Sequence, residues 1–303
     1  NINSITADFL MKKIEEDPSV IAVNAATPGA MGLTQEWRKK AGKQFVDVGI
    51  AEEHAVAFIS GLAKGGARPV FLVFGSFLQR TCDQLMQDLA LNRNPAVILV
   101  YDARIGSGDA THNGTYATAL EHMIPNVKVF SPYLKEDYLQ ILGWAMRQRE
   151  FPVIINVPDG IHEGEAAFDA DSYGSYHVVK DGQDAAMIGF GKFRETAERT
   201  AELLEQKGVH AMVVDPLISG TVDFSMLSKI KDTCRVVATM EDGMLQGGTG
   251  REISAYYSTS PVKVLNFGAE KEYLDRVGDD AMLERYSLKP EQIAAQILKE
   301  LEV

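Results

Sequence analysis

The stretch Asp47-Val48-Gly49-Ile50-Ala51-Glu52-Glu53-His54-Ala55 joins the end of an apolar run to a glycine and a pair of carboxylates. The apolar run predicts a buried strand, Gly49 permits a tight turn, and the residues after it predict a helix over Glu53–Lys64. In a doubly wound α/β sheet such a turn lies at the C-terminal edge of the strands, where ligands usually bind. This stretch therefore predicts an α/β fold, with Glu52 at the sheet edge where ligands usually bind.

Apolar runs recur on both sides of this stretch at the spacing of an α/β domain. They are mostly continuous rather than alternating, which is typical of a parallel sheet covered on both faces. The predicted strands are Val20–Val23, Phe45–Val48, Pro69–Val73, Ala96–Tyr101, Val127–Phe130 and Val153–Val157. The predicted helices are Ala7–Glu16, Gln35–Lys40, Glu53–Lys64, Gln79–Leu91, Tyr116–His122 and Lys135–Arg147.

The second half of the chain repeats this pattern on a smaller scale. A glycine-containing, acidic segment with little apolar periodicity precedes it, and we interpret residues 161–184 as a linker. We therefore predict two doubly wound α/β domains, a mostly parallel one over residues 1–160 and a smaller one over 185–303. The predicted elements of the second are strands at Ala185–Ile188, His210–Val214, Val236–Met240 and Val262–Asn266, and helices at Arg194–Gln206 and Glu291–Leu301.

Composition excludes several classes of protein. The 303 residues carry a net charge of -12, which argues against a nucleic-acid-binding surface. No run approaches the ~18 apolar residues that a membrane span needs, and Asn1–Ser19 has no signal-peptide core. The two cysteines, Cys82 and Cys234, are far apart and indicate neither a disulfide framework nor a zinc site. We predict a cytoplasmic protein that binds neither membrane nor nucleic acid.

Pattern alone leaves the role of each candidate site residue open. A carboxylate at a helix start, such as Glu52, is as often a cap as a catalytic group. Phe77 follows a strand and fits core packing as well as ring stacking. His112 lies in a polar, glycine-rich loop, Gly106–Gly114, where a lone histidine is usually solvated. Arg80 fits an anion site or an ion pair with Asp83 or Asp88. The glycines 247, 248 and 250 fit a strand-to-helix turn better than a phosphate site.

Ordered motifs give these residues a common interpretation. The segment GIAEEHAV resembles GIAEQHAV of 1-deoxyxylulose-5-phosphate synthases and the shorter G-I-x-E of transketolases. Similar segments follow the order of the same proteins along nearly the whole chain. They are Thr27-Pro28-Gly29-Ala30-Met31, Gly75-Ser76-Phe77-Leu78-Gln79-Arg80 with Asp83-Gln84, Thr111-His112-Asn113-Gly114, Ile124-Pro125-Asn126, and Met240-Glu241-Asp242 with Gly247-Gly248-Thr249-Gly250.

The resemblance implies a thiamine-pyrimidine-binding domain followed by a transketolase C-terminal-like domain, with thiamine diphosphate as cofactor. In that family the glutamate matched by Glu52 hydrogen-bonds N1′ of the aminopyrimidine and promotes the tautomer that takes the proton from C2. Phe77 matches the aromatic residue that stacks on this ring, and Ile50 and Phe74 are expected beside it. His112 matches a residue that contacts substrate oxygens, so it is expected in substrate binding or proton transfer.

Further substrate contacts are expected from Arg80, Asp109 and Arg104. The synthases carry arginines that this chain lacks in Asn156-Val157-Pro158-Asp159-Gly160. Because arginines clamp phosphates by bidentate hydrogen bonds, a sugar phosphate is not expected to be held in the synthase manner, although Arg104 could compensate.

The chain lacks the G-D-G…N motif through which the family binds Mg²⁺ and the diphosphate. We predict no metal ligands here, a companion N-terminal subunit that binds most of the Mg²⁺ site, and self-association into a dimer. The expected activity is transfer of a two-carbon ketol unit between sugars. The alternatives are a decarboxylating condensation of a 2-oxo acid with an aldehyde, a β subunit of a 2-oxo-acid dehydrogenase, and a non-catalytic α/β module.

Overall fold

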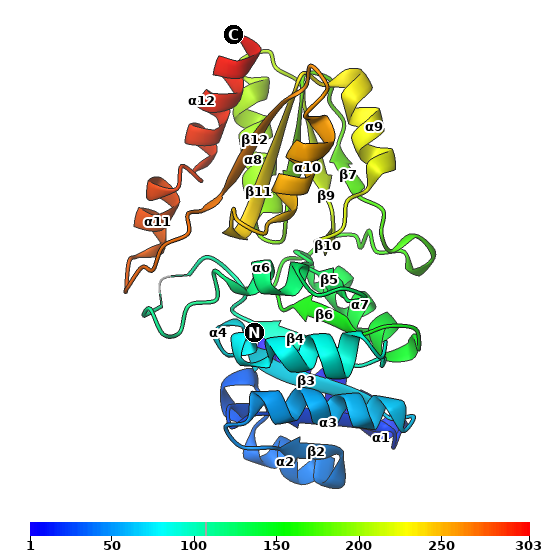
Figure 1. Cartoon of the computed structure of the whole chain (residues 1–303). Coiled ribbons are helices and arrows are strands. Elements are labelled where there is room, and N and C mark those ends of the chain that lie inside the picture. The colour runs from blue at the N-terminus through cyan, green and yellow to red at the C-terminus, as the bar shows by residue number, and fades with distance from the viewer. Residues whose placement is uncertain (107) are drawn as a thin grey trace. The chain divides into compact units, whose positions relative to one another are not determined.

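The computed structural model describes residues 1–106 and 108–303, and these divide into two compact units (Figure 1). Unit 1 comprises Asn1–Ala103 and Met123–Ala170, and unit 2 comprises Arg104–His122 and Asp171–Val303. Ser107, which belongs to the predicted glycine-rich loop, lies outside the described residues. Each unit has its own mostly parallel sheet, which confirms the predicted fold class of two α/β domains.

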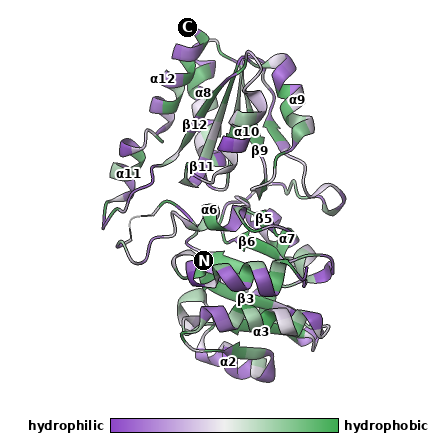
Figure 2. Cartoon of the chain, in the orientation of Figure 1, coloured by the Kyte–Doolittle hydropathy of each residue, from purple (hydrophilic) through white to green (hydrophobic). Residues whose placement is uncertain are grey.

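The strands of unit 1 lie side by side in the order β5-β6-β4-β3-β1-β2, and each neighbouring pair is parallel. β4 is buried along its whole length, as expected of a strand with both faces covered. Figure 2 shows hydrophobic residues concentrated in strands such as β3 and β6, whereas α2 is largely hydrophilic. The strands are β1 (Val20–Asn24), β2 (Phe45–Asp47), β3 (Arg68–Phe74), β4 (Val97–Tyr101), β5 (Lys128–Phe130) and β6 (Val153–Asn156). The strand predictions for this half are confirmed.

Most helices of unit 1 also match their predicted ranges, but α1 begins at Ile2 rather than at the predicted Ala7, and one predicted helix differs in type. Gln79–Leu91 is not one α-helix but a succession of a 3₁₀ turn, a short α-helix and a π-helix. The Thr81 hydroxyl donates to the Leu78 carbonyl at 2.7 Å, and such side-chain bonds compete with the helical ladder. The helices are α1 (Ile2–Glu16), η1 (Pro28–Met31), α2 (Gln35–Ala41), η2 (Gly42–Gln44), α3 (Glu52–Lys64), α4 (Gly75–Leu78), η3 (Gln79–Thr81), α5 (Cys82–Gln84), η4 (Leu85–Ala90) and α7 (Lys135–Arg147).

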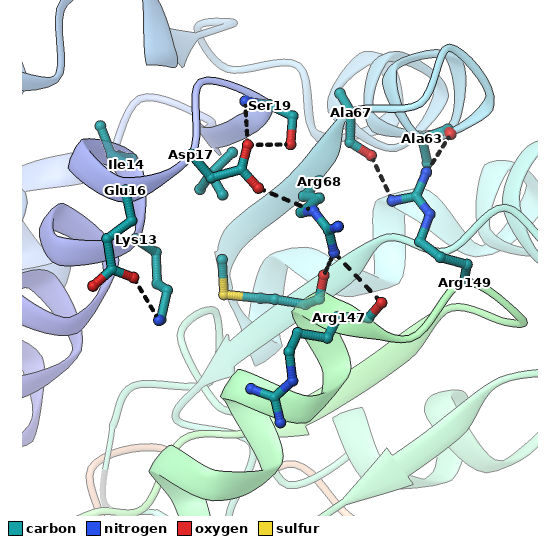
Figure 3. Close-up of polar contacts among 12 residues, drawn as sticks. Lys13, Ile14, Glu16, Asp17, Ser19, Ala63, Ala67, Arg68, Arg147 and Arg149 are labelled. Carbon is teal, nitrogen blue, oxygen red and sulfur yellow. Dashed lines mark hydrogen bonds and ion pairs between the residues drawn. The ribbon is translucent and has the colours of Figure 1, made fainter.

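Arg68, the first residue of β3, connects this strand to two other segments of unit 1 (Figure 3). Its Nε lies 3.1 Å from Asp17 Oδ2, after the end of α1. Its Nη1 donates to the carbonyl of Met146, near the end of α7, at 2.7 Å. Hydrogen bonds from Ser19 and the Arg68 guanidinium hold the pKa of Asp17 below its usual range. The end of the sheet at which β3 begins is thereby fixed by charge-assisted hydrogen bonds.

Unit 2 contains a sheet in the order β12-β11-β8-β9-β7, in which only the β7–β9 pair is antiparallel. β7 lies within the residues predicted as a linker, and the linker bounds themselves stay a prediction. The strands are β7 (His177–Lys180), β8 (Ala185–Gly189), β9 (Ala211–Asp215), β11 (Val236–Met244) and β12 (Lys263–Ala269), and a short strand β10 (Ile218–Ser219) also occurs.

Helices of unit 2 include several that the sequence did not predict. α8 (Phe193–Glu205) and α12 (Pro290–Leu301) match their predicted ranges, and the segment with α6 (Ala117–His122) groups with this unit. The helices without a prediction are α9 (Phe224–Thr233), α10 (Thr249–Tyr257) and α11 (Asp279–Arg285), together with the 3₁₀ turn η5 (Ala170–Ser172). Among the helices of the described residues, none has the length and apolar character required to cross a membrane.

Candidate functional site

Glu52 is the first residue of α3, after β2 and the left-handed Gly49 (φ 76°). Only 2% of the residue is exposed. The N-cap position belongs to Ala51, which makes no side-chain cap hydrogen bond. Glu52 Oε2 instead accepts a hydrogen bond from Arg80 Nη1 at 3.0 Å. The carboxylate is therefore buried and ion-paired, and it does not serve as the N-cap of α3.

Arg80 contributes the opposite charge from η3, after β3. It pairs with Glu52 rather than with Asp83 or Asp88, so the predicted pairing with those aspartates is wrong for the described residues. Its side chain is 47% exposed, and its guanidinium carbon lies 5.9 Å from the centre of the Phe77 ring. Arg80 therefore joins the carboxylate and the aromatic ring into one cluster. The predicted anion-binding role stays open.

Phe74 and Phe77 provide an aromatic surface beside this cluster. Phe74 ends β3 and Phe77 lies in α4, and both are half-buried. Their ring centres are 6.1 Å apart with nearly perpendicular planes, which is a favoured arrangement for aromatic pairs. Ile50, two residues before Glu52, is 77% exposed, which is unusual for so large an apolar side chain. Unit 1 thus has a buried carboxylate next to accessible apolar groups, as the binding of a planar, partly apolar ring requires.

The other predicted site residues lie in unit 2. Asp109 Oδ1 accepts hydrogen bonds from Thr111 N at 2.9 Å and His112 N at 3.1 Å, and lies 3.2 Å from His112 Nδ1. Hydrogen bonds from the Thr111 side chain and from His112 hold the pKa of Asp109 far below its usual range. The carboxylate therefore orients the imidazole, whose side chain is 61% exposed.

Glycine at position 108 allows this turn to close. A Cβ added there would lie 2.7 Å from the His112 carbonyl oxygen. Arg104 is half-buried at the start of unit 2, and its carbonyl accepts a hydrogen bond from the Thr115 hydroxyl at 3.4 Å. The predicted residues thus form two groups, Glu52, Phe74, Phe77 and Arg80 in one unit and Arg104, Asp109 and His112 in the other. Their functional roles stay predictions.

Two titratable groups of unit 2, to which the sequence assigned no role, contact the glycine-rich turn before α10. Glu241, in β11, is 6% exposed, and its Oε1 accepts a hydrogen bond from Gly250 N at 3.2 Å. Burial raises the pKa of Glu241 to about 7. His122 Nδ1 lies 2.9 Å from the Gly247 carbonyl, and burial lowers the pKa of His122 to about 4. The available signal was the glycine-rich turn itself, which the structure confirms as a strand-to-helix turn between β11 and α10.

No group of histidine, cysteine, aspartate and glutamate side chains among the described residues is arranged to hold a metal ion.

Family models match both halves of the chain. The model described as "Transketolase, pyrimidine binding domain" matches residues 2–161. The chain belongs to the transketolase family. The model described as "Transketolase, C-terminal domain" matches residues 174–293 of this transketolase-family chain. The resemblance inferred from the motifs is therefore confirmed.

Similar proteins of known sequence include 1-deoxy-D-xylulose-5-phosphate synthases. The one from Symbiobacterium thermophilum is 34% identical over 297 residues, 96% of this chain and 46% of that protein. The one from Trichodesmium erythraeum is 30% identical over 304 residues, 98% of this chain and 48% of that protein. The transketolase-family chain thus spans about half the length of the curated relatives it matches.

Solved structures show the same fold. A chain described as a split-gene transketolase in an inactive β4 tetramer superposes with a TM-score of 0.84 at 24% identity, covering 98% of this chain and 96% of that one. A transketolase variant from Pichia stipitis superposes with a TM-score of 0.79 at 14% identity, covering 99% of this chain and 46% of that one. At these identities the likeness concerns the fold alone.

Proposed function

We propose that this chain is one subunit of a thiamine-diphosphate-dependent transferase of the transketolase type, which moves a two-carbon ketol unit between sugars. The observation that carries the proposal is the cluster in which Arg80 joins the buried Glu52 carboxylate to the half-buried Phe77 ring, within the pyrimidine-binding domain of the family. A buried carboxylate next to apolar groups suits one edge and one face of an aminopyrimidine. The residues present therefore fit this cofactor.

Each residue of the unit 1 cluster has a distinct task in this proposal. Glu52 holds a proton at N1′ of the aminopyrimidine, and its carboxylate has enough lone pairs to keep Arg80 as a second partner. Phe77 and Phe74 contact the ring, and Ile50 covers it from the exposed side. The bound cofactor supplies stabilisation of carbanions, which amino-acid side chains cannot provide.

Substrate recognition is assigned to the group in unit 2 and to Arg80. Asp109 fixes the His112 ring, so that the imidazole meets the substrate's oxygen atoms in a single orientation. Arg104 and Arg80 provide positive charge for the anionic part of a sugar substrate. We propose His112 as the group that binds the substrate carbonyl or hydroxyl and transfers its proton.

A companion subunit completes the site. These 303 residues lack the G-D-G…N motif, and we propose that a second chain binds Mg²⁺ and the diphosphate. The likeness in fold to a split-gene transketolase chain of matching length supports this division. We also propose that the chain forms a dimer within the assembled enzyme. Alone it should not catalyse.

The second candidate is a decarboxylating condensation of a 2-oxo acid with an aldehyde. It is favoured by the curated relatives at about 30% identity, which are named as synthases of this kind. The departures in Asn156–Gly160 weigh against it, because the arginines of the synthase pattern are absent there.

The test is to mix the chain with a companion carrying the G-D-G…N motif, thiamine diphosphate and Mg²⁺, and to assay ketose and 2-oxo-acid donors. Glu52→Gln should lower turnover roughly 10³-fold, because a positioned proton-transfer group contributes on that order. Glu53→Gln is the matched control, since Glu53 is the exposed neighbour on the same helix, and its turnover should stay within about twofold. Circular dichroism and assembly should be unchanged in both variants.

Two results would contradict the proposal. Release of CO₂ from a 2-oxo acid, without ketol transfer from a sugar, would favour the synthase type. Full turnover of Glu52→Gln would remove the cofactor role of this carboxylate.

A further inference from the structure

The loop that carries Asp109 and His112 is held by residues more than eighty positions later in the chain. We name this segment, residues 104–116, the His112 loop. Its described residues, 104–106 and 108–116, form turns and bends rather than a helix or a strand. A segment without regular structure keeps one conformation only where other groups satisfy its backbone. The partners described below for residues 105, 108, 110, 115 and 116 lie within unit 2.

The start of the His112 loop is held at Ile105. Its N–H donates to Asp242 Oδ1, from β11, at 2.8 Å, and its carbonyl accepts from Lys192 Nζ, before α8, at 3.2 Å. Lys192 and Asp242 also form an ion pair at 3.3 Å. The Ile105 side chain is 4% exposed and belongs to the hydrophobic core of unit 2. The backbone N–H and C=O of Ile105 are thereby both hydrogen-bonded to charged side chains.

The middle of the loop is held on both sides of Asp109. Ala110 N donates to Asp275 Oδ1 at 3.2 Å, and Arg276 N donates to the Gly108 carbonyl at 3.1 Å. Asp275 and Arg276 lie between β12 and α11. Asp109, the residue before Ala110, accepts a hydrogen bond from His112 N. Two hydrogen bonds and the Asp109–Ala110 peptide bond therefore connect Asp275 to the backbone of His112.

The end of the loop is held by the same part of unit 2. Met244 N, at the end of β11, donates to the Thr115 carbonyl at 3.1 Å. The Tyr116 hydroxyl donates to the Glu272 carbonyl. Glu272 is itself fixed by Arg285 of α11, whose Nε and Nη2 donate to its two carboxylate oxygens at 2.7 and 2.6 Å. Bidentate pairs of this kind add geometric specificity.

We infer that Asp275 is a positioning residue: through Ala110 it fixes the loop so that Asp109 and His112 meet the substrate in one geometry. This rests on the proposed function of His112. We name the hydrogen bonds that unit 2 makes to the His112 loop the clamp. Among them, the bond from Ala110 N to Asp275 lies nearest to His112 in the sequence, so its loss should change the position of His112 the most. The C-terminal half thereby acts on the substrate site through hydrogen bonds to the backbone, and Asp275 itself need not touch substrate. Positioning of this kind carries a large share of enzymatic rate enhancement.

The test compares Asp275→Ala with Asp275→Asn. The asparagine keeps an oxygen acceptor for Ala110 N–H, whereas the alanine removes it. In the full chain, hydrogen–deuterium exchange over residues 108–114 should be about tenfold faster in Asp275→Ala and within about twofold of wild type in Asp275→Asn, because one hydrogen bond contributes on this order. Exchange in the strands of unit 1 should not change. Glu270→Ala removes another exposed carboxylate of the same segment and should leave the loop unchanged.

Steady-state kinetics of the assembled enzyme then test the positioning role. Asp275→Ala should raise KM for the sugar by a factor about ten times larger than the factor by which it lowers kcat. Asp275→Asn should keep both constants close to their wild-type values. Unchanged exchange in Asp275→Ala would overturn the clamp. Faster exchange with unaltered KM and kcat would overturn the positioning role alone. If wild-type enzyme has no activity with any donor, the proposed function fails and the positioning role fails with it, whereas the exchange result still decides the clamp.

Discussion

Each unit contains a buried glutamate near the start of a helix, and the two have different partners. Glu52 begins α3 and is 2% exposed, and Glu241 contacts the start of α10 and is 6% exposed. Glu52 pairs with a cation, Arg80, at 3.0 Å, and the guanidinium carbon of Arg80 lies 5.9 Å from the centre of the half-buried Phe77 ring. Glu241 instead accepts a hydrogen bond from the backbone N–H of Gly250. Equal burial therefore does not indicate an equal role, because the partners decide what each carboxylate can do.

The surroundings of Glu241 indicate a structural role. A Cβ added to Gly248 would lie 2.0 Å from Glu241 Oε2, so the turn packs directly on the carboxylate. Burial raises the pKa of Glu241 to about 7, although hydrogen bonds from Gly250 and Thr249 act in the opposite direction. His122 contacts the same turn at Gly247, and burial lowers its pKa to about 4. Glu241 and His122 should therefore give the stability of unit 2 opposite dependences on pH.

Of the substitutions considered, Glu241→Gln should have the largest effect on the pH dependence of the free energy of unfolding. The folded pKa of about 7 lies above the ordinary pKa of 4.5 for a glutamate, so the folded state binds the proton more tightly than the unfolded state. The associated stability is complete below pH 4.5 and is lost as the pH rises to 7. The loss is about 3 kcal/mol, from the free-energy equivalent of a pKa shift. The free energy of unfolding of wild type relative to Glu241→Gln, from urea titrations, should fall by that amount across this window.

Glu252→Gln is the control for this experiment. Glu252 lies in the first turn of the same helix, α10, but is exposed. The free energy of unfolding of Glu252→Gln should follow the pH dependence of wild type within about 0.5 kcal/mol. Parallel pH dependences for wild type and Glu241→Gln would show that burial of this carboxylate has no energetic consequence.

His122→Asn should change the pH dependence in the opposite direction. The folded pKa of about 4 lies below the ordinary pKa of 6.5 for a histidine, so the folded state binds the proton less tightly than the unfolded state. The stability is complete above pH 6.5 and is lost as the pH falls to 4. We expect the free energy of unfolding to fall by about 2 kcal/mol over this range. This loss is smaller than for Glu241 because His122 is partly exposed and solvent screens its charge. Asparagine keeps a donor for the Gly247 carbonyl, and the variant should therefore lose less stability than wild type on acidification, as measured by urea unfolding. An equal loss in both proteins would rule out His122 as the source.

The strands and the position of Glu52 could be predicted because they depend on local pattern. Continuous apolar runs indicate buried parallel strands wherever they occur, and β1 to β6 matched them. The ion pair of Glu52 could not be predicted in the same way. Arg80 is 28 residues away in sequence, and local spacing favoured Asp83 and Asp88 as partners. Only the folded arrangement around α3 and η3 selects among the three carboxylates.

The assignment of the His112 loop to unit 2 was hidden for a similar reason. Its sequence continues from β4 of unit 1, so a chain-order interpretation keeps it in the first domain. Its hydrogen bonds run to Asp242, Glu272 and Asp275, which carry no sequence signal for such contacts. Backbone groups of a loop are satisfied by whatever the fold brings near them. The sequence motif therefore identified His112, whereas only the structure shows which residues of unit 2 hold its loop in place.

Arg80→Met tests the other half of the comparison, with the smallest expected effect on stability. The substitution leaves the buried Glu52 carboxylate without its ion-pair partner and removes the cation beside the Phe77 ring. A fully buried pair would lose about 3–5 kcal/mol when one partner is removed. Because the Arg80 side chain is 47% exposed and screened by water, we expect about 1.5 kcal/mol in the free energy of unfolding at pH 7. Lys39→Met, at an exposed position of α2, should cost less than about 0.5 kcal/mol. If Arg80→Met is as stable as the lysine control, the carboxylate tolerates burial without its cation, and Glu52 and Glu241 would then differ in position alone.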